Sequence, residues 1–280
     1  MAHPDRFLLA GVMGWPVMHS RSPMLHNYWF KQHGLAGNYV PLAIRPEGLA
    51  AALGALHPLG CARCNLTIPH KQQAMKIVDE VDTLARSIGA ISCVVIRADG
   101  SLSGTNNDCY GFIHNIRQEQ PGWRADAGPI AVIGAGGGSR AVCYGLAREG
   151  AKEIRLLNRT FARAKGIADE FGKPINALPW EQRHEALEGA AMVVNTTSCG
   201  MVGQPSLDVR LDKLPKSALA ADIIYIPLET PFLAAARKRG NRTVNGLGML
   251  LNQGRPAWKA WFGIDPEVTP ELRAMVERTI

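Results

Sequence analysis

The chain has 280 residues and a mass of 30.3 kDa, with 46% hydrophobic and 20% charged residues. These values and a mean hydropathy of −0.05 are typical of a globular protein of about two domains, which excludes disordered and fibrous classes. Gly, Pro or a charge interrupts every apolar stretch before the roughly 18 residues that a membrane helix needs. The first six residues lack the basic-then-apolar layout of a secretory signal, so we expect a cytoplasmic protein with no membrane partner.

The formal net charge is +7, from 31 basic and 24 acidic residues. Because the basic residues are scattered, the surplus favours small anionic ligands over nucleic acid. The six cysteines follow no disulfide framework, and the one CxxC spacing, at residues 61–64, has no second ligand pair. We therefore expect reduced thiols and no metal site.

Strand-like and helical segments alternate along the first part of the chain. Ser22 has the residue type of an N-cap and is followed by Pro23, and Gly34 is placed to end that helix. Asp99-Gly100 is a typical hairpin turn between two short strands. The predicted strands are 7–12, 38–44, 63–68, 91–96 and 101–105, and the predicted helices are 22–33 and 49–56.

A second alternation follows the linker-like residues 120–129, after a helical run at 109–117. Strands that alternate with helices favour a parallel, doubly wound sheet. Two helices are predicted at the end of the chain, the first with a break or kink near Pro256. The predicted strands are 129–133, 153–157, 191–195, 219–224 and 242–244, and the predicted helices are 139–149, 161–171, 231–239, 249–262 and 270–279.

The segment GAGGGSRA at 134–141 lies between a predicted strand and a predicted helix. It matches G-x-G-x-x-G/A with serine at the final position. Glycines let the backbone approach a pyrophosphate, and the helix N-terminus offers unpaired N–H groups to the anion. This context favours a dinucleotide site over a plain glycine-rich loop, and the predicted cofactor-binding residues are Gly134, Ala135, Gly136, Gly137, Gly138 and Ser139.

The end of the next strand indicates which dinucleotide binds. An NAD site usually has Asp or Glu about 20 residues after the glycines, whereas this chain has Asn158, Arg159 and Thr160, with Arg163 one turn later. A guanidinium binds a 2′-phosphate through charge-assisted hydrogen bonds, so NADP is the predicted cofactor. A solvated, basic start of a helix is the alternative.

Five further motifs resemble those of the shikimate dehydrogenase family, in order and over nearly the whole chain. They are GWPVMHSRSPMLHN at 14–27, NLTIPHK at 65–71, NTTSCGM at 195–201, DIIY at 222–225 and GLGMLLNQ at 246–253. The resemblance implies an α/β protein with an N-terminal α/β substrate domain, a Rossmann-type doubly wound NADP-binding domain and a cleft between them.

The implied activity is reversible hydride transfer between NADP(H) and shikimate/3-dehydroshikimate or a close cyclic polyol acid. The implied catalytic and substrate-binding domain is 1–108, completed by helices at 246–280, and the implied NADP-binding domain is 109–245. A monomer or a homodimer is expected.

By position, the family's roles fall on specific residues of this chain. Lys71 and Asp108 would be the catalytic pair, with Ser20 and Ser22 at the substrate carboxylate. The other substrate-binding positions are Thr67, Ser92, Asn107, Tyr225 and Gln253. Further cofactor-binding positions are Thr197, Ile223, Gly246 and Met249.

The residue types support the main roles by themselves. Ser20 and Ser22 stand where a helix is predicted to start, which favours an anion, although Ser22 could serve only as an N-cap. Lys71 lies in a first turn, where the helix dipole disfavours a cation, and a residue that breaks a local rule is a candidate functional group. Asp108 could equally be a simple N-cap.

Two positions depart from the family's pattern. Ser92 replaces the usual asparagine of a Gly-Ala-Val-Asn-Thr motif, and Asn107 replaces a hydroxyl residue directly before Asp108. Asn107 could restore the missing amide, or the site could serve quinate or an amino analogue of shikimate. A dinucleotide-binding regulator that has lost efficient catalysis is the alternative from another functional class.

Overall fold

The computed structural model describes residues 7–280, which divide into two compact units, each described by itself below. The first unit holds the residues up to Asn107 together with Leu251–Thr279. The second unit holds Asp108–Leu250 and the final residue, Ile280. Helix α9 (Leu247–Phe262) contains the boundary between them.

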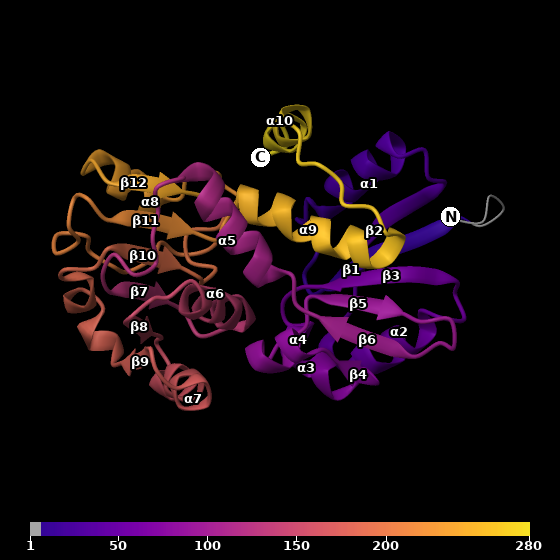
Figure 1. The fold of residues 1–280 in the computed structure, drawn as a ribbon, viewed down its shortest axis with the longest axis horizontal. Coiled ribbons are helices and arrows are strands. Elements are labelled where there is room, and N and C mark those ends of the chain that lie inside the picture. The colour runs from indigo at the N-terminus through magenta and orange to yellow at the C-terminus, as the bar shows by residue number, and fades with distance from the viewer. Residues whose placement is uncertain (1–6) are drawn as a thin grey trace. The chain divides into compact units, whose positions relative to one another are not determined.

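The first unit is built on a mixed six-stranded sheet with the order β2-β1-β3-β5-β6-β4 (Figure 1). β1 is parallel to β2 and β3, whereas β5 is antiparallel to both β3 and β6. Pro41 lies in β2, an edge strand, where its missing N–H costs no ladder hydrogen bond. The strands are β1 (Leu8–Gly14), β2 (Gly37–Ala43), β3 (Cys61–Leu66), β4 (Glu80–Val81), β5 (Cys93–Ile96) and β6 (Leu102–Thr105).

The helices of this unit have recognisable start and stop signals. The Asp82 side chain caps α4 by accepting from the Ala85 N–H at 2.6 Å, and Gly89, with φ +73°, ends it. Thr269 caps α10 in the same way through the Leu272 N–H. The helices are α1 (Ser22–Gln32), α2 (Leu49–Ala55), α3 (His70–Gln73), α4 (Thr83–Ile88) and α10 (Pro270–Glu277), with short 3₁₀ turns at Pro46–Gly48 and Ala74–Lys76.

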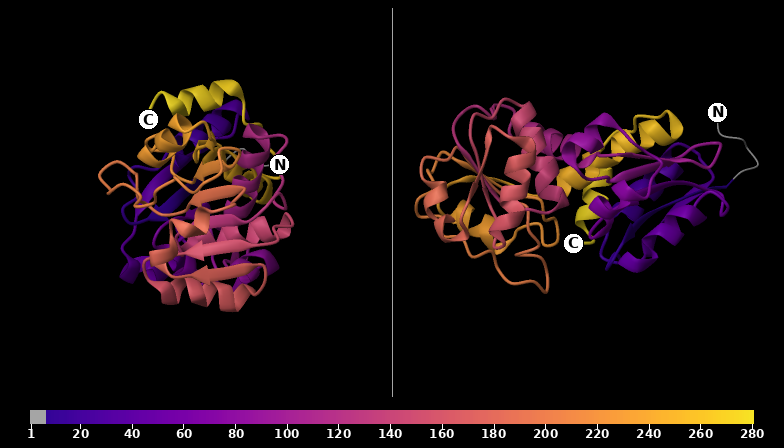
Figure 2. Two further views of the ribbon diagram at one scale, coloured as in Figure 1. Left: turned by 90° about the vertical axis from the view of Figure 1, so that its left-hand side faces the viewer. Right: turned by 90° about the horizontal axis from the view of Figure 1, so that it is seen from below.

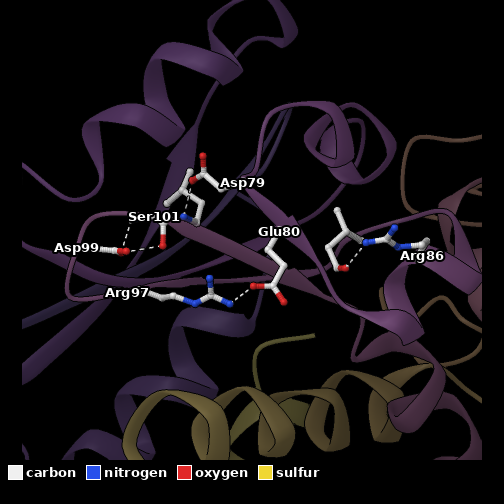
Figure 3. A network of polar contacts seen from close by, with 8 residues as sticks. Asp79, Glu80, Arg86, Arg97, Asp99 and Ser101 are labelled. Carbon is white, nitrogen blue, oxygen red and sulfur yellow. Dashed lines mark hydrogen bonds and ion pairs between the residues drawn. The ribbon is translucent and has the colours of Figure 1, made fainter.

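The short edge strand β4 is fastened to β6 by side chains as well as by its backbone. Asp79 accepts a hydrogen bond from the Leu102 N–H at 2.7 Å, and Glu80 pairs with Arg97. These contacts hold the edge of the sheet where only two residues pair through the backbone. Figure 3 shows them beside the contacts of Arg86, Asp99 and Ser101.

A buried aromatic cluster joins α1, β2 and α9 within the first unit. His26 is 2% exposed, stacks on Tyr39 with ring centroids 4.1 Å apart, and accepts a hydrogen bond from Trp258 Nε1 at 2.6 Å. Trp29 and Trp261 also lie against the imidazole. Burial without a charged partner lowers the pKa of His26 to about 3, so the ring is neutral in the folded protein at neutral pH.

The second unit is a doubly wound sheet of six strands, all parallel, in the order β12-β11-β10-β7-β8-β9 (Figure 1). This arrangement confirms the parallel sheet predicted from the alternation of strands and helices. The strands are β7 (Ile130–Ile133), β8 (Ile154–Leu157), β9 (Ile175–Leu178), β10 (Met192–Asn195), β11 (Leu219–Asp222) and β12 (Arg242–Val244). The helices are α5 (Asp108–Glu119), α6 (Gly137–Arg148), α7 (Phe161–Phe171) and α8 (Pro231–Lys238), with 3₁₀ turns at Trp180–Gln182 and Glu185–Leu187.

Both faces of this sheet are buried, which explains why its strands are almost continuously apolar. Along β7, Ile130 and Val132 belong to a core that includes residues of α5, α6 and α7. Ala131 and Ile133 belong to a second core with residues of α8. Figure 2 shows the unit from two further sides, with helices on either face of the sheet.

Several details differ from the sequence prediction, which also lacks β4 and α4. Ser22 is not the N-cap of α1, because Arg21 occupies that position and Ser22 is the first helical residue. The Ser22 N–H donates a hydrogen bond to Ser20 Oγ at 3.2 Å. Pro256 lies inside the helix Leu247–Phe262 and does not break it, while the predicted kink there stays a prediction. Helix α6 begins at Gly137 rather than Ser139, because two glycines continue the helical turn. The strand β9 was not predicted, since its four residues follow a proline and carry little periodicity.

Among residues 7–280, no helix combines the length and apolar character required to cross a membrane.

We predict that His26 makes the protein less stable in acid. In unfolded chains a histidine has a pKa near 6.5, whereas folded His26 has a pKa of about 3, so the unfolded state binds more protons between these values. The free energy of unfolding is therefore fully retained above pH 6.5. Below pH 6.5, the titration of this group lowers the free energy of unfolding by up to about 1.4 kcal/mol per pH unit.

Chemical denaturation of the wild type and His26→Gln between pH 7.5 and 4.5 measures this difference in slope. The exposed histidine variant His57→Gln serves as the control and is expected to keep the wild-type slope. Equal slopes in the wild type and His26→Gln would contradict the prediction.

Candidate active site

Strand direction gathers the predicted residues of the first unit at one edge of its sheet. β1, β3 and β6 end at this edge, and the antiparallel β5 begins there, as the pairs Met13–Leu66, Asn65–Cys93 and Cys93–Thr105 show. The segments that follow or precede these strand ends carry the candidate side chains. They are Ser20, Ser22, Thr67, Lys71, Ser92 and Asn107.

Ser20 and Ser22 lie at the start of α1, in the segment that follows β1. The Ser20 hydroxyl accepts from the Ser22 N–H, and the first turn of the helix contains no acidic residue. Two hydroxyls and the positive end of an 11-residue helix therefore lie close together. This arrangement suits a carboxylate ligand.

The backbone holds Lys71 firmly from both sides. The Ile91 N–H donates to the Lys71 carbonyl at 2.8 Å, and the His70 N–H donates to the Thr67 carbonyl at 2.9 Å. The His70 ring is buried, and its Nε2 lies 2.8 Å from the carbonyl of Ile44, which ties this turn to the segment after β2. Lys71 itself is half-buried, so part of the residue remains accessible to solvent.

Ser92 and Asn107 form a directly bonded pair. The Asn107 N–H donates to Ser92 Oγ at 2.8 Å, and the Ser92 N–H donates to the Thr105 carbonyl at 2.9 Å. Asn107 is 5% exposed, and its side chain lies beside the buried Cys93 thiol. The two positions that depart from the family's pattern are thus physically coupled, because one accepts a hydrogen bond from the backbone of the other.

Asp108 follows Asn107 directly and is the first residue of α5, one residue before the helical run predicted from sequence. Asp108 is 1% exposed. A carboxylate in the first turn is favoured by the helix dipole. Gln253 is half-buried on α9, and Tyr225 is half-buried in the segment after β11.

In the second unit, the glycine loop follows β7, where the strand order reverses between β8 and β10. Gly134 has φ +116°, and a Cβ there would lie 2.6 Å from Thr196 Oγ1, so only glycine fits. Ser139 Oγ donates to the Gly134 carbonyl at 2.5 Å and closes the loop. Gly136 is exposed, and a Cβ there would meet no atom within 4 Å, so the loop is accessible at this residue.

The residues after β8 extend this anion site. The Asn158 side chain donates to the Thr160 carbonyl at 2.9 Å and fixes the turn, while Arg159 and Arg163 are exposed. Lys165, on the same helix, is instead engaged with Asp169 at 2.7 Å. The loop and the guanidiniums therefore fit a dinucleotide that carries an additional phosphate.

The remaining predicted cofactor positions differ in character. Thr197 follows β10 and Ile223 follows β11, and a Cβ at Gly246 would collide with the backbone of Ile223. Met249 belongs to the hydrophobic core of the second unit. Its side chain therefore packs the core.

Sequence reasoning did not assign a role to Asn195 and Asp222, which the structure joins at the ends of β10 and β11. Both stand inside motifs quoted above. A polar residue as the last residue of an apolar strand is the signal that could have singled them out.

Within the described part of the chain, no group of three or more His, Cys, Asp or Glu side chains is arranged to hold a metal ion. The six cysteines are free thiols. Burial raises the pKa of Cys93 and Cys143 to about 12, which keeps both thiols protonated at neutral pH.

A parallel sheet with a glycine loop at its point of strand reversal defines a dinucleotide-binding α/β protein of the Rossmann type. Comparison with known proteins gives the family. Residues 12–94 match the family model of the shikimate dehydrogenase substrate binding domain, and residues 120–224 match that of shikimate / quinate 5-dehydrogenase.

Individual relatives agree over almost the full length. A protein of Paramagnetospirillum magneticum named shikimate dehydrogenase (NADP(+)) is 52% identical, with 96% of this chain and 97% of that protein covered. The crystal structure of shikimate dehydrogenase from Aquifex aeolicus has a TM-score of 0.88 at 34% identity and covers 98% of both chains.

The structure of shikimate 5-dehydrogenase from Thermus thermophilus in complex with NADP(H) and shikimate has a TM-score of 0.85 at 33% identity, with 97% of this chain and 99% of that chain covered. The chain belongs to the shikimate dehydrogenase family. The family assignment and the fold class predicted from the motifs are confirmed.

We predict that Arg159 sets the preference for NADP. Replacing it by alanine removes charge-assisted hydrogen bonds to the 2′-phosphate, which are worth roughly 1.5–3 kcal/mol. The KM for NADP should therefore rise about 10- to 100-fold, while the KM for NAD stays nearly constant. Initial rates with each cofactor measure this.

Lys165→Ala is the matched control, because it removes a positive charge from the same segment that already pairs with Asp169. It should leave both KM values within about twofold of wild type, since an exposed pair contributes little. A similar loss of NADP affinity in both variants would refute a specific role of Arg159.

Proposed function

We propose that the protein is an NADP-dependent shikimate dehydrogenase that catalyses reversible hydride transfer between NADP(H) and shikimate/3-dehydroshikimate. The observation that supports this proposal most strongly is that the candidate residues of the first unit lie at a single edge of its sheet. A carboxylate-binding helix start, a hydroxyl residue and a lysine gather there. Shikimate offers the complementary groups, a carboxylate and ring hydroxyls.

In this proposal the substrate carboxylate is held by Ser20 and Ser22. Their hydroxyls donate to it, and the start of α1 adds a favourable dipole. The ring hydroxyls are contacted by the other predicted substrate residues. These are Thr67, Ser92, Asn107, Tyr225 and Gln253.

The proton chemistry is assigned to Lys71 and Asp108. On oxidation the carbinol O–H and C–H bonds break and a C=O bond forms. Lys71 Nζ, in its neutral form, accepts the single proton of the reacting hydroxyl and returns it on reduction. Asp108 accepts a hydrogen bond from a neighbouring ring hydroxyl and holds Lys71 in place. Bound NADP⁺ supplies the acceptor for the hydride that leaves the carbinol carbon.

The cofactor is held by the second unit. The backbone of the glycine loop at 134–139 contacts the pyrophosphate, and Arg159 with Arg163 contacts the 2′-phosphate. Asn158 and Thr160 shape the turn that carries these guanidiniums. The reactive end of the cofactor is assigned to the segments that carry Thr197, Ile223, Gly246 and Met249.

The name shared by relatives about half identical to this chain favours shikimate over quinate or an amino analogue, and an enzyme over a regulator. A cytoplasmic location and a monomeric or homodimeric state are part of the proposal. Analytical ultracentrifugation tests the oligomeric state.

A substrate and cofactor panel tests the function. Shikimate, quinate and their amino analogues are each assayed with NADP⁺ and NAD⁺ by absorbance at 340 nm. We expect kcat/KM to be highest for shikimate with NADP⁺, by at least about tenfold over quinate. Binding of NADPH without oxidation of any panel member would instead favour the regulator.

We predict that Lys71→Ala lowers kcat for shikimate oxidation by about 10²- to 10⁴-fold, the usual contribution of general acid–base catalysis. The dissociation constant for NADPH, measured by fluorescence titration, should not change, since the glycine loop and Arg159 are intact.

Lys76→Ala is the matched control, an exposed lysine five residues further along the same segment. It should retain wild-type kcat. Undiminished turnover in Lys71→Ala would remove the assigned base from the mechanism.

A further inference from the structure

The last residues of β10 and β11 face each other in register and are directly hydrogen-bonded. Asn195 pairs with Asp222 along the two strands, and its Nδ2 donates to both carboxylate oxygens of Asp222, at 3.1 and 3.2 Å. We propose that Asp222 is a positioning residue for the dehydrogenase reaction. It fixes the two segments that carry Thr197 and Tyr225.

Asp222 holds the segment after β11 in a defined shape. One carboxylate oxygen accepts from the Ile224 N–H at 2.9 Å, and the other accepts from Thr230 Oγ1 at 2.9 Å. Thr230 in turn caps α8 by accepting from the Leu233 N–H. Tyr225 therefore lies in a segment whose two ends, residues 224 and 230, are both hydrogen-bonded to the Asp222 carboxylate.

Asn195 holds the segment after β10 in the same way. Its Oδ1 accepts from the N–H and the hydroxyl of Thr197, at 3.0 and 2.7 Å, and its Nδ2 donates to the Cys199 carbonyl at 3.0 Å. The Thr197 hydroxyl then accepts from the Cys199 N–H at 3.0 Å. The amide of Asn195 thus links the fold of this turn to Asp222.

The third strand end is joined through the backbone. The Gly246 N–H donates to the Ile224 carbonyl at 2.8 Å, and the Ile223 N–H donates to the Asn195 carbonyl at 3.1 Å. The ends of β10, β11 and β12 consequently form one hydrogen-bonded edge, with the Asp222 carboxylate at its centre.

The charge state of Asp222 matters to this arrangement. Asp222 is 2% exposed, and its carboxylate accepts each of the side-chain hydrogen bonds described for it above. Burial raises its pKa to about 6, whereas the hydrogen bonds from Ile224, Asn195 and Thr230 favour the carboxylate. An asparagine at this position would turn an N–H₂ group toward donors, because an amide offers only one acceptor atom.

This inference rests on the proposed function, because Thr197 and Tyr225 act at the reactive end of the site only if the protein is a dehydrogenase. The glycine loop and Arg159 make none of these hydrogen bonds, so the contacts to the cofactor's phosphates should be retained. Because Thr197, Ile223 and Gly246 are assigned to the reactive end of the cofactor, loss of Asp222 should also weaken NADPH binding, but by a smaller factor than catalysis and shikimate binding.

The test is the variant Asp222→Asn, assayed with shikimate and NADP⁺. We expect kcat to fall and the KM for shikimate to rise, each about tenfold, since small misplacements near reacting groups cost up to about 10²-fold. The dissociation constant for NADPH should change by less than about threefold. Asn195→Ser, which cannot span the distance to Asp222, should give the same pattern and replaces Asp222→Asn if that variant does not fold.

Asn241→Ala is the matched control within the same sheet. Asn241 is also buried, and it bonds the carbonyls of Pro215, Lys216 and Ala218 before β11 begins, at the opposite edge. This variant should lower the melting temperature while kcat and KM stay within about twofold of wild type.

The proposal is overturned if both network variants lower only the melting temperature, as Asn241→Ala does. It is also overturned if NADPH binding falls as much as kcat/KM, because the damage would then be general. Failure of the wild type to oxidise shikimate would refute the proposed function instead, so the two failures are distinguishable.

Discussion

The direction of the strands is the constraint on which the candidate site depends. Parallel strands end at one edge of a sheet. The segments that follow these strands therefore lie at the same edge, even when they are far apart in the sequence. In the first unit β1, β3 and β6 end at that edge, and the antiparallel β5 starts there. In the second unit all six strands run the same way, so the segments after β7, β8, β10, β11 and β12 meet at one edge.

Each edge is held rigid by a different type of contact. In the first unit the backbone dominates, as in the bonds from Ile91 to the Lys71 carbonyl and from Ser92 to the Thr105 carbonyl. In the second unit buried side chains add a network centred on Asp222 and Asn195. Hydrogen bonds in a buried, low-dielectric setting are costly to leave incomplete, which makes such networks effective at fixing one arrangement.

The sequence predicted most of what depends on local signals. Alternating apolar segments predicted five of the six strands of the doubly wound sheet, and the glycine loop and Arg159 predicted an NADP site. Local signals failed where tertiary contacts decide. Ser22 has the residue type of an N-cap, yet Arg21 occupies the N-cap position. The Ser22 N–H instead donates a hydrogen bond to Ser20 Oγ. The hydrogen bond between Asn107 and Ser92 joins residues 15 positions apart, and the one between Asn195 and Asp222 joins residues 27 positions apart. No local pattern reveals such pairs.

The central claim is that shikimate and NADP⁺ bind at these two strand edges with Lys71 at the reacting hydroxyl. A crystal structure of the Lys71→Ala variant with both ligands tests it most directly, because the variant is expected to turn over too slowly to consume them. The account predicts the substrate carboxylate against Ser20 and Ser22 and the 2′-phosphate at Arg159. It also predicts that the reacting hydroxyl faces the truncated side chain at position 71, with a neighbouring ring hydroxyl within hydrogen-bond distance of Asp108. Shikimate bound away from Ser20 and residue 71, or a 2′-phosphate away from Arg159, would contradict it.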